Sequence, residues 1–254
     1  MLVVALYLHF QHSVLTFVMA YARLALVFYL LPALGERILS NLIIKNVVIS
    51  LVIIGLWPCL GQEVRPEQGW LTLLVKECVI GLILAMTLCV PFWIAAVLGE
   101  IIDNQRGATI SDSIDPVNGS QSSVLSGFLS FAFSAIFFAS NGMHLLMEVL
   151  AQSYQVFPRG NELTGFVWLE AGRLLAVLMQ VSILLAAPVL IVLMVSEVML
   201  GVFARYCPQL NPFSLSLAIK SFIAFSVFLF YGFNALSEKP LKIFYVVTLQ
   251  HFFP

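Results

Sequence analysis

Charged residues are scarce in this chain, and long uncharged runs take their place. Asp, Glu, Lys and Arg make up 10% of the 254 residues, against about 25% in a typical soluble domain. Hydrophobic residues make up 61%, against a norm of about 45–50%. The uncharged runs Cys78–Gly99 and Val124–Met147 each exceed the roughly 18 residues that indicate a membrane-spanning helix. This composition excludes a soluble globular fold and predicts an integral membrane protein.

The usual signatures of catalysis and of metal, disulfide or nucleic-acid binding are also missing. There is no GxSxG, HExxH or phosphate-binding glycine loop, and the four histidines have no Cys or carboxylate at metal-ligand spacing. The cysteines lack CxxC spacing and lie in or near apolar segments, which is typical of inert thiols (Cys59, Cys78, Cys89 and Cys207). The net charge of −1 provides no basic surface. We expect no enzyme activity, cofactor, metal or nucleic-acid partner.

The apolar residues fall into about six long segments, which predict an all-α integral membrane protein. Each segment must be helical in lipid, because unpaired backbone groups cannot be hydrated there. The segments are 13–34, 41–60, 71–99, 124–150, 173–202 and 213–237. Short connections predict antiparallel hairpins. Since the first Lys or Arg is Arg23, the apolar start of the chain is not expected to be a cleaved signal peptide.

Two of the segments do not fit a simple span. As one helix, 71–99 would measure about 44 Å, well past the roughly 30 Å of the hydrocarbon core. Pro91 and Pro188 lie inside 71–99 and 173–202, and both helices are expected to be bent or broken there. Lys and Arg divide six against five between the two sides of a six-span arrangement, so the positive-inside rule gives no orientation.

Several ionisable residues lie within or at the ends of these apolar segments. Arg23, Glu197 and Lys220 lie well inside, where a charge either pairs across helices or lines a polar channel. Four others lie within a turn or two of a predicted helix end, where their side chains are expected to reach the membrane interface. These four are Lys45, Lys76, Glu77 and Glu148.

Serines recur every fourth residue along the segment that follows the most polar part of the chain. Small residues at this spacing let helices approach closely, and their hydroxyls can bond across the contact. We expect close helix packing by these serines, with a pore lining as the alternative. They are Ser122, Ser126, Ser130 and Ser134.

The most polar stretch is 100–123, EIIDNQRGATISDSIDPVNGSQSS. It opens with Glu100, Asp103 and Arg106 at i, i+3 and i+6, and its Gly, Asp, Asn and Pro residues then favour turns. A connection of this length is often functional, and at membrane depth it must be shielded by protein or water. A solvated loop outside the bilayer is the alternative.

Composition alone leads to a polytopic membrane protein with a transport or scaffold role. Four stretches together resemble the T component (SctT/FliR family) of the type III secretion export apparatus, and the version DNQRGAT is closest to the virulence injectisome branch. They are VPFWIAAVLGEIIDNQRGATI at 90–110, SSVLSGFL at 122–129, NGMHLLMEVLAQSYQVFP at 141–158 and PQLNPFSLSLAIKSF at 208–222. Their order and spacing match the family over nearly the whole chain.

The resemblance implies a subunit of the export gate in the bacterial inner membrane. T subunits of this family assemble with R-type and S-type subunits into a ring, and unfolded substrate proteins pass through this ring. The U-type switch protein lies next to it. Their helices form staggered hairpins that stand partly above the membrane plane. In this chain, the resemblance implies an R-like part at 1–172 and an S-like hairpin with an aromatic tail at 173–254.

The resemblance also assigns two sets of residues to the pore. The loop at about 103–122 would enter the lumen as a plug, with Gln105, Arg106, Gly107, Asp112, Asp115 and Asn118 near the closed pore. The turn of the S-like hairpin would form a polar closure at the cytoplasmic end, with Gln209, Asn211 and Lys220. A self-sufficient small-solute transporter with broken helices at Pro91 and Pro188 is the alternative function.

Overall fold

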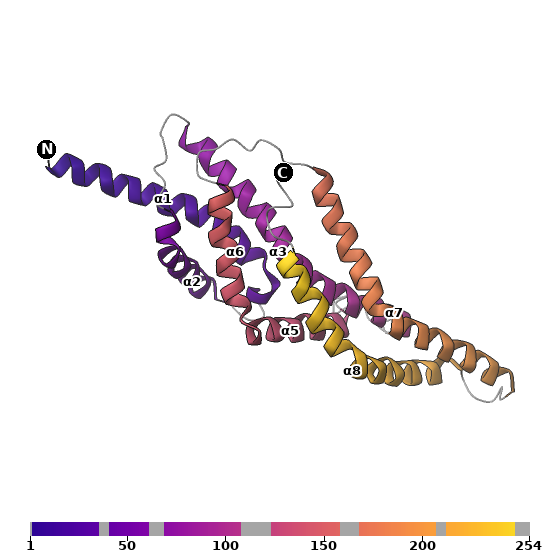
Figure 1. The fold of residues 1–254 in the computed structure, drawn as a ribbon. Helices are drawn as coiled ribbons and strands as arrows, with labels where there is room; N and C mark the ends of the chain where they lie inside the picture. Colours follow the sequence, from indigo (N-terminus) through magenta and orange to yellow (C-terminus); the bar gives the residue numbers. More distant parts are fainter. Residues whose placement is uncertain are drawn as a thin grey trace, which may run out of the picture. The chain divides into compact units, whose positions relative to one another are not determined.

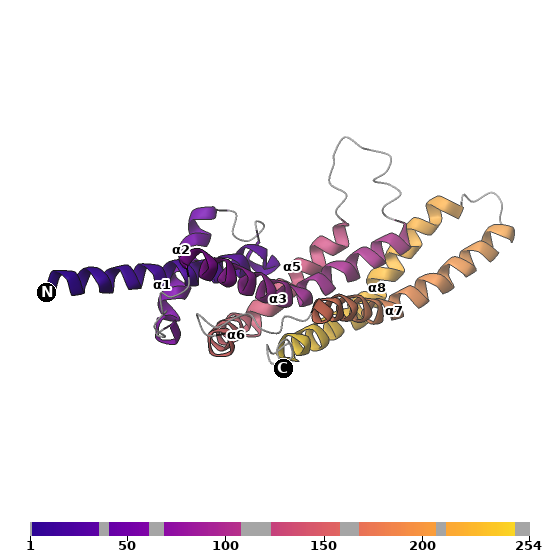
Figure 2. The ribbon, with the colours of Figure 1, turned by 90° about the horizontal axis from the view of Figure 1, so that it is seen from above.

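The computed structural model describes residues 2–35, 41–60, 69–107, 123–157, 168–206 and 212–246, and the regular structure of these residues is entirely helical (Figures 1 and 2). The α-helices are α1 (Leu2–Leu30), α2 (Leu42–Gly55), α3 (Trp70–Arg106), α5 (Val124–Ala139), α6 (Gly142–Val156), α7 (Trp168–Tyr206) and α8 (Pro212–Val246). Short 3₁₀ turns follow α1 at Pro32–Leu34 and α2 at Trp57–Leu60. The predicted all-α class is confirmed.

The number of conventional spans among the described residues is smaller than the six apolar segments suggest. Three helices are long and apolar enough to cross a bilayer: His9–Leu30, Trp70–Arg106 and Leu175–Tyr206. The pair α5 and α6 makes a fourth if the two are one broken span, while Leu42–Gly55 and Ser216–Gly232 are shorter apolar helices. Every predicted segment is helical, but about six long spans are not found.

Local chemistry explains two of these differences. In the segment 41–60, α2 begins at an Asn41 cap, whose side chain accepts a hydrogen bond from the Ile43 N–H, and ends at Gly55 before the 3₁₀ turn that contains Pro58. In the segment 124–150, the helix is interrupted before Gly142, because Asn141 adopts a left-handed conformation with φ 60°. Asn tolerates that region better than most residues, and a regular helix cannot pass through it.

The two prolines do not break their helices. Pro91 lies inside the 37-residue α3 and Pro188 inside the 39-residue α7, and both helices are continuous through the proline. α7 changes direction along its length in both views (Figures 1 and 2). A proline removes one backbone hydrogen bond, and the surrounding turns keep the helix intact. At about 55 Å, α3 is longer than the hydrocarbon core is thick.

The contacts divide the chain into two units, which are described separately. The first unit takes in the described residues of 1–90, 138–171 and 246–254. In it, α2 lies beside the later part of α1 (Figures 1 and 2). The core consists of apolar residues at i, i+3 and i+4 spacing on α1 together with residues of α2, α3 and α6. Its fully buried members include Leu24, Val27, Phe28, Ile49, Ile53 and Leu150.

The second unit takes in the described residues of 91–137 and 172–245. Its core contains the ring of Phe92, which meets Phe133 and Phe137 edge-on, with ring centroids 5.0 and 5.3 Å apart. Such edge-to-face pairs stabilise a core beyond the area they bury. α3 and α5 approach closely here, because a Cβ on Gly99 would lie 2.8 Å from the carbonyl carbon of Leu125. The described ion pairs of this unit lie at the end of α3, between Asp103 and Arg106, and between Glu197 of α7 and Lys220 of α8.

Candidate functional site

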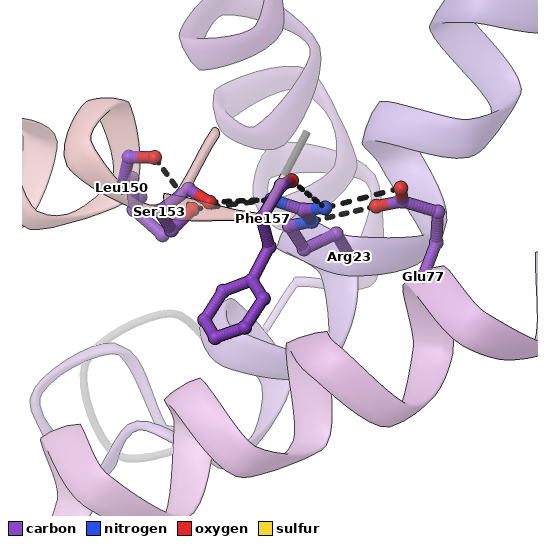
Figure 3. A network of polar contacts seen from close by, with 5 residues as sticks. All are labelled: Arg23, Glu77, Leu150, Ser153 and Phe157. Carbon is purple, nitrogen blue, oxygen red and sulfur yellow. Dashed lines mark hydrogen bonds and ion pairs between the residues drawn. The ribbon is translucent and has the colours of Figure 1, made fainter. Parts of the chain in front are cut away.

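A fully buried arginine forms the main polar centre of the first unit. Arg23 of α1 has no exposed surface, and its guanidinium binds the Glu77 carboxylate of α3 through two hydrogen bonds (Figure 3). The Nε of Arg23 donates to Glu77 Oε2 at 2.6 Å, and its Nη2 donates to Oε1 at 3.0 Å. This two-point geometry fixes both the distance and the orientation of the pair, so it ties α1 to α3.

The same guanidinium also binds the carboxyl end of α6. Nη1 donates to the Ser153 carbonyl at 3.2 Å and lies 3.4 Å from its hydroxyl, while Nη2 donates to the Phe157 carbonyl at 3.2 Å. Figure 3 shows the guanidinium between Glu77 on one side and the end of α6 on the other. The ring of Tyr154 lies 4.1 Å from the Arg23 Cζ. A cation at a helix C-terminus and over an aromatic ring is favourable, so Arg23 ties three helices together.

The position of Glu77 follows from a glycine one turn later on α3. A Cβ on Gly81 would lie 2.9 Å from the Cα of Arg23, so only glycine allows α1 and α3 to approach this closely. The expectation that Glu77 reaches the membrane interface is therefore wrong: its side chain is buried against Arg23. Lys45 is also buried, with its Nζ 4.7 Å from the centre of the Tyr29 ring.

A second polar cluster joins the end of α3 to the start of α5 in the second unit. Asp103 is 1% exposed, and its carboxylate accepts hydrogen bonds from Arg106 Nε at 2.6 Å, from the Ser123 hydroxyl and from the Leu125 N–H at 2.9 Å. The Ser123 hydroxyl accepts a hydrogen bond from the Ser126 N–H at 3.0 Å. Asp103 and Ser123 together bind two of the N–H groups that the first turn of a helix leaves without partners.

Arg106 extends this cluster to α8. Its Nη1 donates to the Ser221 hydroxyl at 3.1 Å, across 115 residues of sequence. Gln105 is exposed, and Gly107 ends α3 with φ 82°, a conformation that favours glycine. The described part of the predicted plug set therefore consists of the half-buried Arg106, which is bound to Asp103 and Ser221, the exposed Gln105 and Gly107.

The other two charges predicted to lie inside the membrane are partners of each other. Lys220 of α8 places its Nζ 3.0 Å from Glu197 Oε1 of α7. The Lys220 side chain is 10% exposed and the Glu197 side chain 64% exposed. The sequence predicts that Arg23, Glu197 and Lys220 either pair across helices or line a polar channel. In the structure each of the three forms an ion pair with a residue of another helix. A role of Lys220 in a polar closure stays a prediction.

The predicted serine stripe runs along one face of α5. Ser126 and Ser134 are buried and Ser130 is half-buried, and the Ser134 hydroxyl donates to the Ser130 carbonyl of its own helix at 2.8 Å. The backbone of Ser126 also occupies the space where a side chain on Gly99 would lie. Their packing role stays a prediction. Several predicted site residues lie outside the described residues: Asp112, Asp115, Asn118, Ser122, Gln209 and Asn211.

Sequence reasoning did not identify three residues of these clusters in the roles they have. Glu77 was detectable, because a buried arginine needs a carboxylate and few carboxylates lie in apolar segments. The sequence predicts Asp103 as part of a charged strip and as the start of the loop at about 103–122, and nothing in the sequence connects it with the start of α5. Ser221 had no signal at all. Among the described residues, no group of three His, Cys, Asp or Glu side chains is placed to hold a metal ion.

Comparison with known proteins shows which chains this one is similar to. Residues 14–238 match the model of "Bacterial export proteins, family 1". The surface presentation of antigens protein SpaR of Salmonella typhimurium is 37% identical over 249 residues, which cover 96% of this chain and 93% of SpaR.

Two further relatives are more distant. The Yop proteins translocation protein T of Yersinia pestis is 28% identical, with 93% of each chain covered. The flagellar biosynthetic protein FliR of Bacillus subtilis is 27% identical, with 82% of this chain and 83% of FliR covered. These matches confirm the resemblance that the four sequence stretches indicate.

Proposed function

Because this chain belongs to the bacterial export proteins of family 1, the SctT/FliR family, we propose that it is a structural and gating subunit of a type III secretion export gate. In this proposal it assembles with R-type and S-type subunits, next to the U-type switch protein, into an inner-membrane channel for unfolded secreted proteins. It acts through its structure and catalyses no reaction. The observation that carries the proposal is the 37% identity to SpaR over 96% of the chain.

The exposed side chains of the second unit support a place within an assembly. α7 carries a long apolar surface in which only a third of the most apolar stretch is buried, and Glu197 is an exposed charge within it. Its large exposed side chains include Ile191, Met194, Val198, Met199 and Val202. Exposed apolar area of this extent is a contact surface in a folded protein. We propose that it faces helices of the R-type and S-type subunits and membrane lipid.

The lengths of the helices support a position partly above the membrane plane. α3, α7 and α8 have 37, 39 and 35 residues, each more than the roughly 20 that cross the hydrocarbon core. We propose that 1–172 is R-like, that 173–254 is S-like, and that the surplus length stands outside the hydrocarbon core at the base of the secretion machine.

Two polar regions are the proposed closures of the channel. The first is the segment around Gln105, Arg106, Gly107, Asp112, Asp115 and Asn118, which would plug the lumen. The second, around Gln209, Asn211 and Lys220, would close its cytoplasmic end. The Gly, Asp and Asn residues of the first region adopt turn conformations at low cost, and the polar side chains of both regions can face water.

Assembly is the direct test of the proposed function. Native mass spectrometry would be run on this chain, expressed with and without its R-type and S-type neighbours. The proposal expects a discrete hetero-oligomer that contains this chain and is lost when the neighbours are omitted. A stable monomer or homo-oligomer that does not bind the R-type and S-type subunits would refute the proposal and favour a self-sufficient transporter.

The plug is tested by shortening it. Deleting residues 112–118 should leave the hetero-oligomer intact, because the described contacts of α3 and α5 lie outside the deletion. The assembled complex should then become permeable to small solutes, measured as dye release from vesicles that contain it. An assembled complex with unchanged permeability would contradict the plug.

A further inference from the structure

A clasp of four polar residues, Asp103, Arg106, Ser123 and Ser221, joins α3, α5 and α8 within the second unit. We propose that Asp103 is a positioning residue, which holds the start of α5 against the end of α3, and that Arg106 fastens both to α8. The clasp thereby fixes Gly107 and Ser123, the described residues on either side of the proposed plug. Only the use of this anchorage in gating rests on the proposed function; the clasp itself does not.

The surroundings of Asp103 support this role. A buried carboxylate is unfavourable unless donors surround it, and both of its oxygens have donors. Oδ1 accepts from Arg106 within α3, while Oδ2 accepts from Ser123 and from the Leu125 N–H of α5. A negative charge at the first turn of a helix is also stabilised by the helix dipole. Asp103 therefore caps a helix other than its own, and that cap orients the first turn of α5.

Arg106 connects the cap to α8 through one planar group. Its Nε faces Asp103 and its Nη1 faces Ser221, so the rigid guanidinium holds a fixed direction between the two partners. The preceding residue of α8, Lys220, pairs with Glu197 of α7. Neighbouring residues of α8 thus bind α3 and α7. Moving α8 away from α3 would break the Arg106–Ser221 bond and leave the Asp103 cap less constrained.

The conformation of the chain at Gly107 makes the clasp an anchor point. Gly107 has φ 82° and closes α3 with a hydrogen bond from its N–H to the Asn104 carbonyl at 3.1 Å, one residue after Arg106. Ser123 stands immediately before α5. The residues where the chain leaves α3 and enters α5 are therefore tied to one buried carboxylate.

Distances between spin labels in the assembled hetero-oligomer test the clasp. Labels are placed at Asn104 and Val124, which are both exposed, in a cysteine-free background. The unaltered chain should give one narrow distance. In Asp103→Ala a broad distribution of distances should replace the narrow one. Asp103→Asn, which keeps an acceptor for the Leu125 N–H, should retain most of the narrow distribution. The control is Glu100→Ala, an exposed carboxylate on the same helix.

A second pair of variants tests the link to α8. With labels at Asn104 and Ala218, Ser221→Ala should broaden the distance distribution. Ser226→Ala should not, because its hydroxyl donates to the Phe222 carbonyl of its own helix. Equal distributions for Ser221→Ala and Ser226→Ala, or for Asp103→Ala and Glu100→Ala, would overturn the clasp.

Permeability separates the clasp from the proposed function. If the clasp anchors a plug, Asp103→Ala complexes should release dye from vesicles, and Asp103→Asn should restore tightness. Broadened distances in a complex that stays tight would leave the clasp standing and contradict the plug. Unchanged distances would overturn the clasp whatever the permeability, and would leave the export function untouched.

Discussion

The buried pair of Arg23 and Glu77 allows the sharpest energetic prediction. Replacing Glu77 by Leu removes both acceptors of the guanidinium and leaves a positive charge with 0% exposure and no counter-charge. Replacing Arg23 by Met leaves the opposite charge, with the Glu77 carboxylate buried. Breaking a buried ion pair by removing one member costs about 3–5 kcal/mol, because the remaining charge stays out of water. Each single variant is expected to lose that much stability.

The double variant Arg23→Met with Glu77→Leu is the informative one. It removes both charges, so the penalty of a lone buried charge disappears, and apolar side chains of similar volume fill the space. What is still lost is the donation from Arg23 to the Ser153 and Phe157 carbonyls at the end of α6, about 1–3 kcal/mol. The double variant should therefore be more stable than either single variant, which is the reverse of additive behaviour.

The free energy of unfolding would be measured by SDS titration in detergent micelles, followed by tryptophan fluorescence. Matched controls are Glu100→Leu and Arg205→Met, because both residues are exposed and lie on helices. These controls should change stability by at most about 0.5 kcal/mol. If the double variant loses as much stability as the two single variants together, the pair is not coupled and the reasoning fails.

Two further outcomes follow from close contacts and from the second ion pair. Gly81→Ala should destabilise by about 1–3 kcal/mol in the same titration, because its Cβ would meet the Arg23 backbone, whereas Gly201→Ala has open space and should stabilise by up to about 1 kcal/mol. Shifts of the same sign would contradict this. Lys220→Ala should reduce secretion more than hetero-oligomer formation, with the exposed Arg205→Ala as control. Loss of the complex itself would make Lys220 a packing residue.

The helical class followed from residue types, and the family followed from the resemblance of four sequence stretches. Uncharged runs longer than a bilayer span can be accommodated only as helices in lipid, so every predicted segment is helical. Boundaries were less predictable. An Asn–Gly pair at 141–142 inside an apolar run interrupts the helix, whereas Pro91 and Pro188 inside equally apolar runs do not. The free-energy cost of a proline or of a left-handed residue in a helix depends on whether neighbouring helices provide alternative contacts. A local sequence pattern does not contain that information.

The candidate site divides in the same way. That a charge in an apolar helix, such as Arg23, needs a partner follows from the residue types, because an isolated charge is too unfavourable in a medium of low dielectric constant. Which partner it has depends on how the helices pack. Glu77 lies 54 residues away and Ser221 lies 115 residues from Arg106, and each meeting depends on where two helices cross. Gly81 allows α3 to cross α1 closely at Arg23 because glycine has no side chain. The space is filled by the backbone of Arg23, which belongs to the other helix.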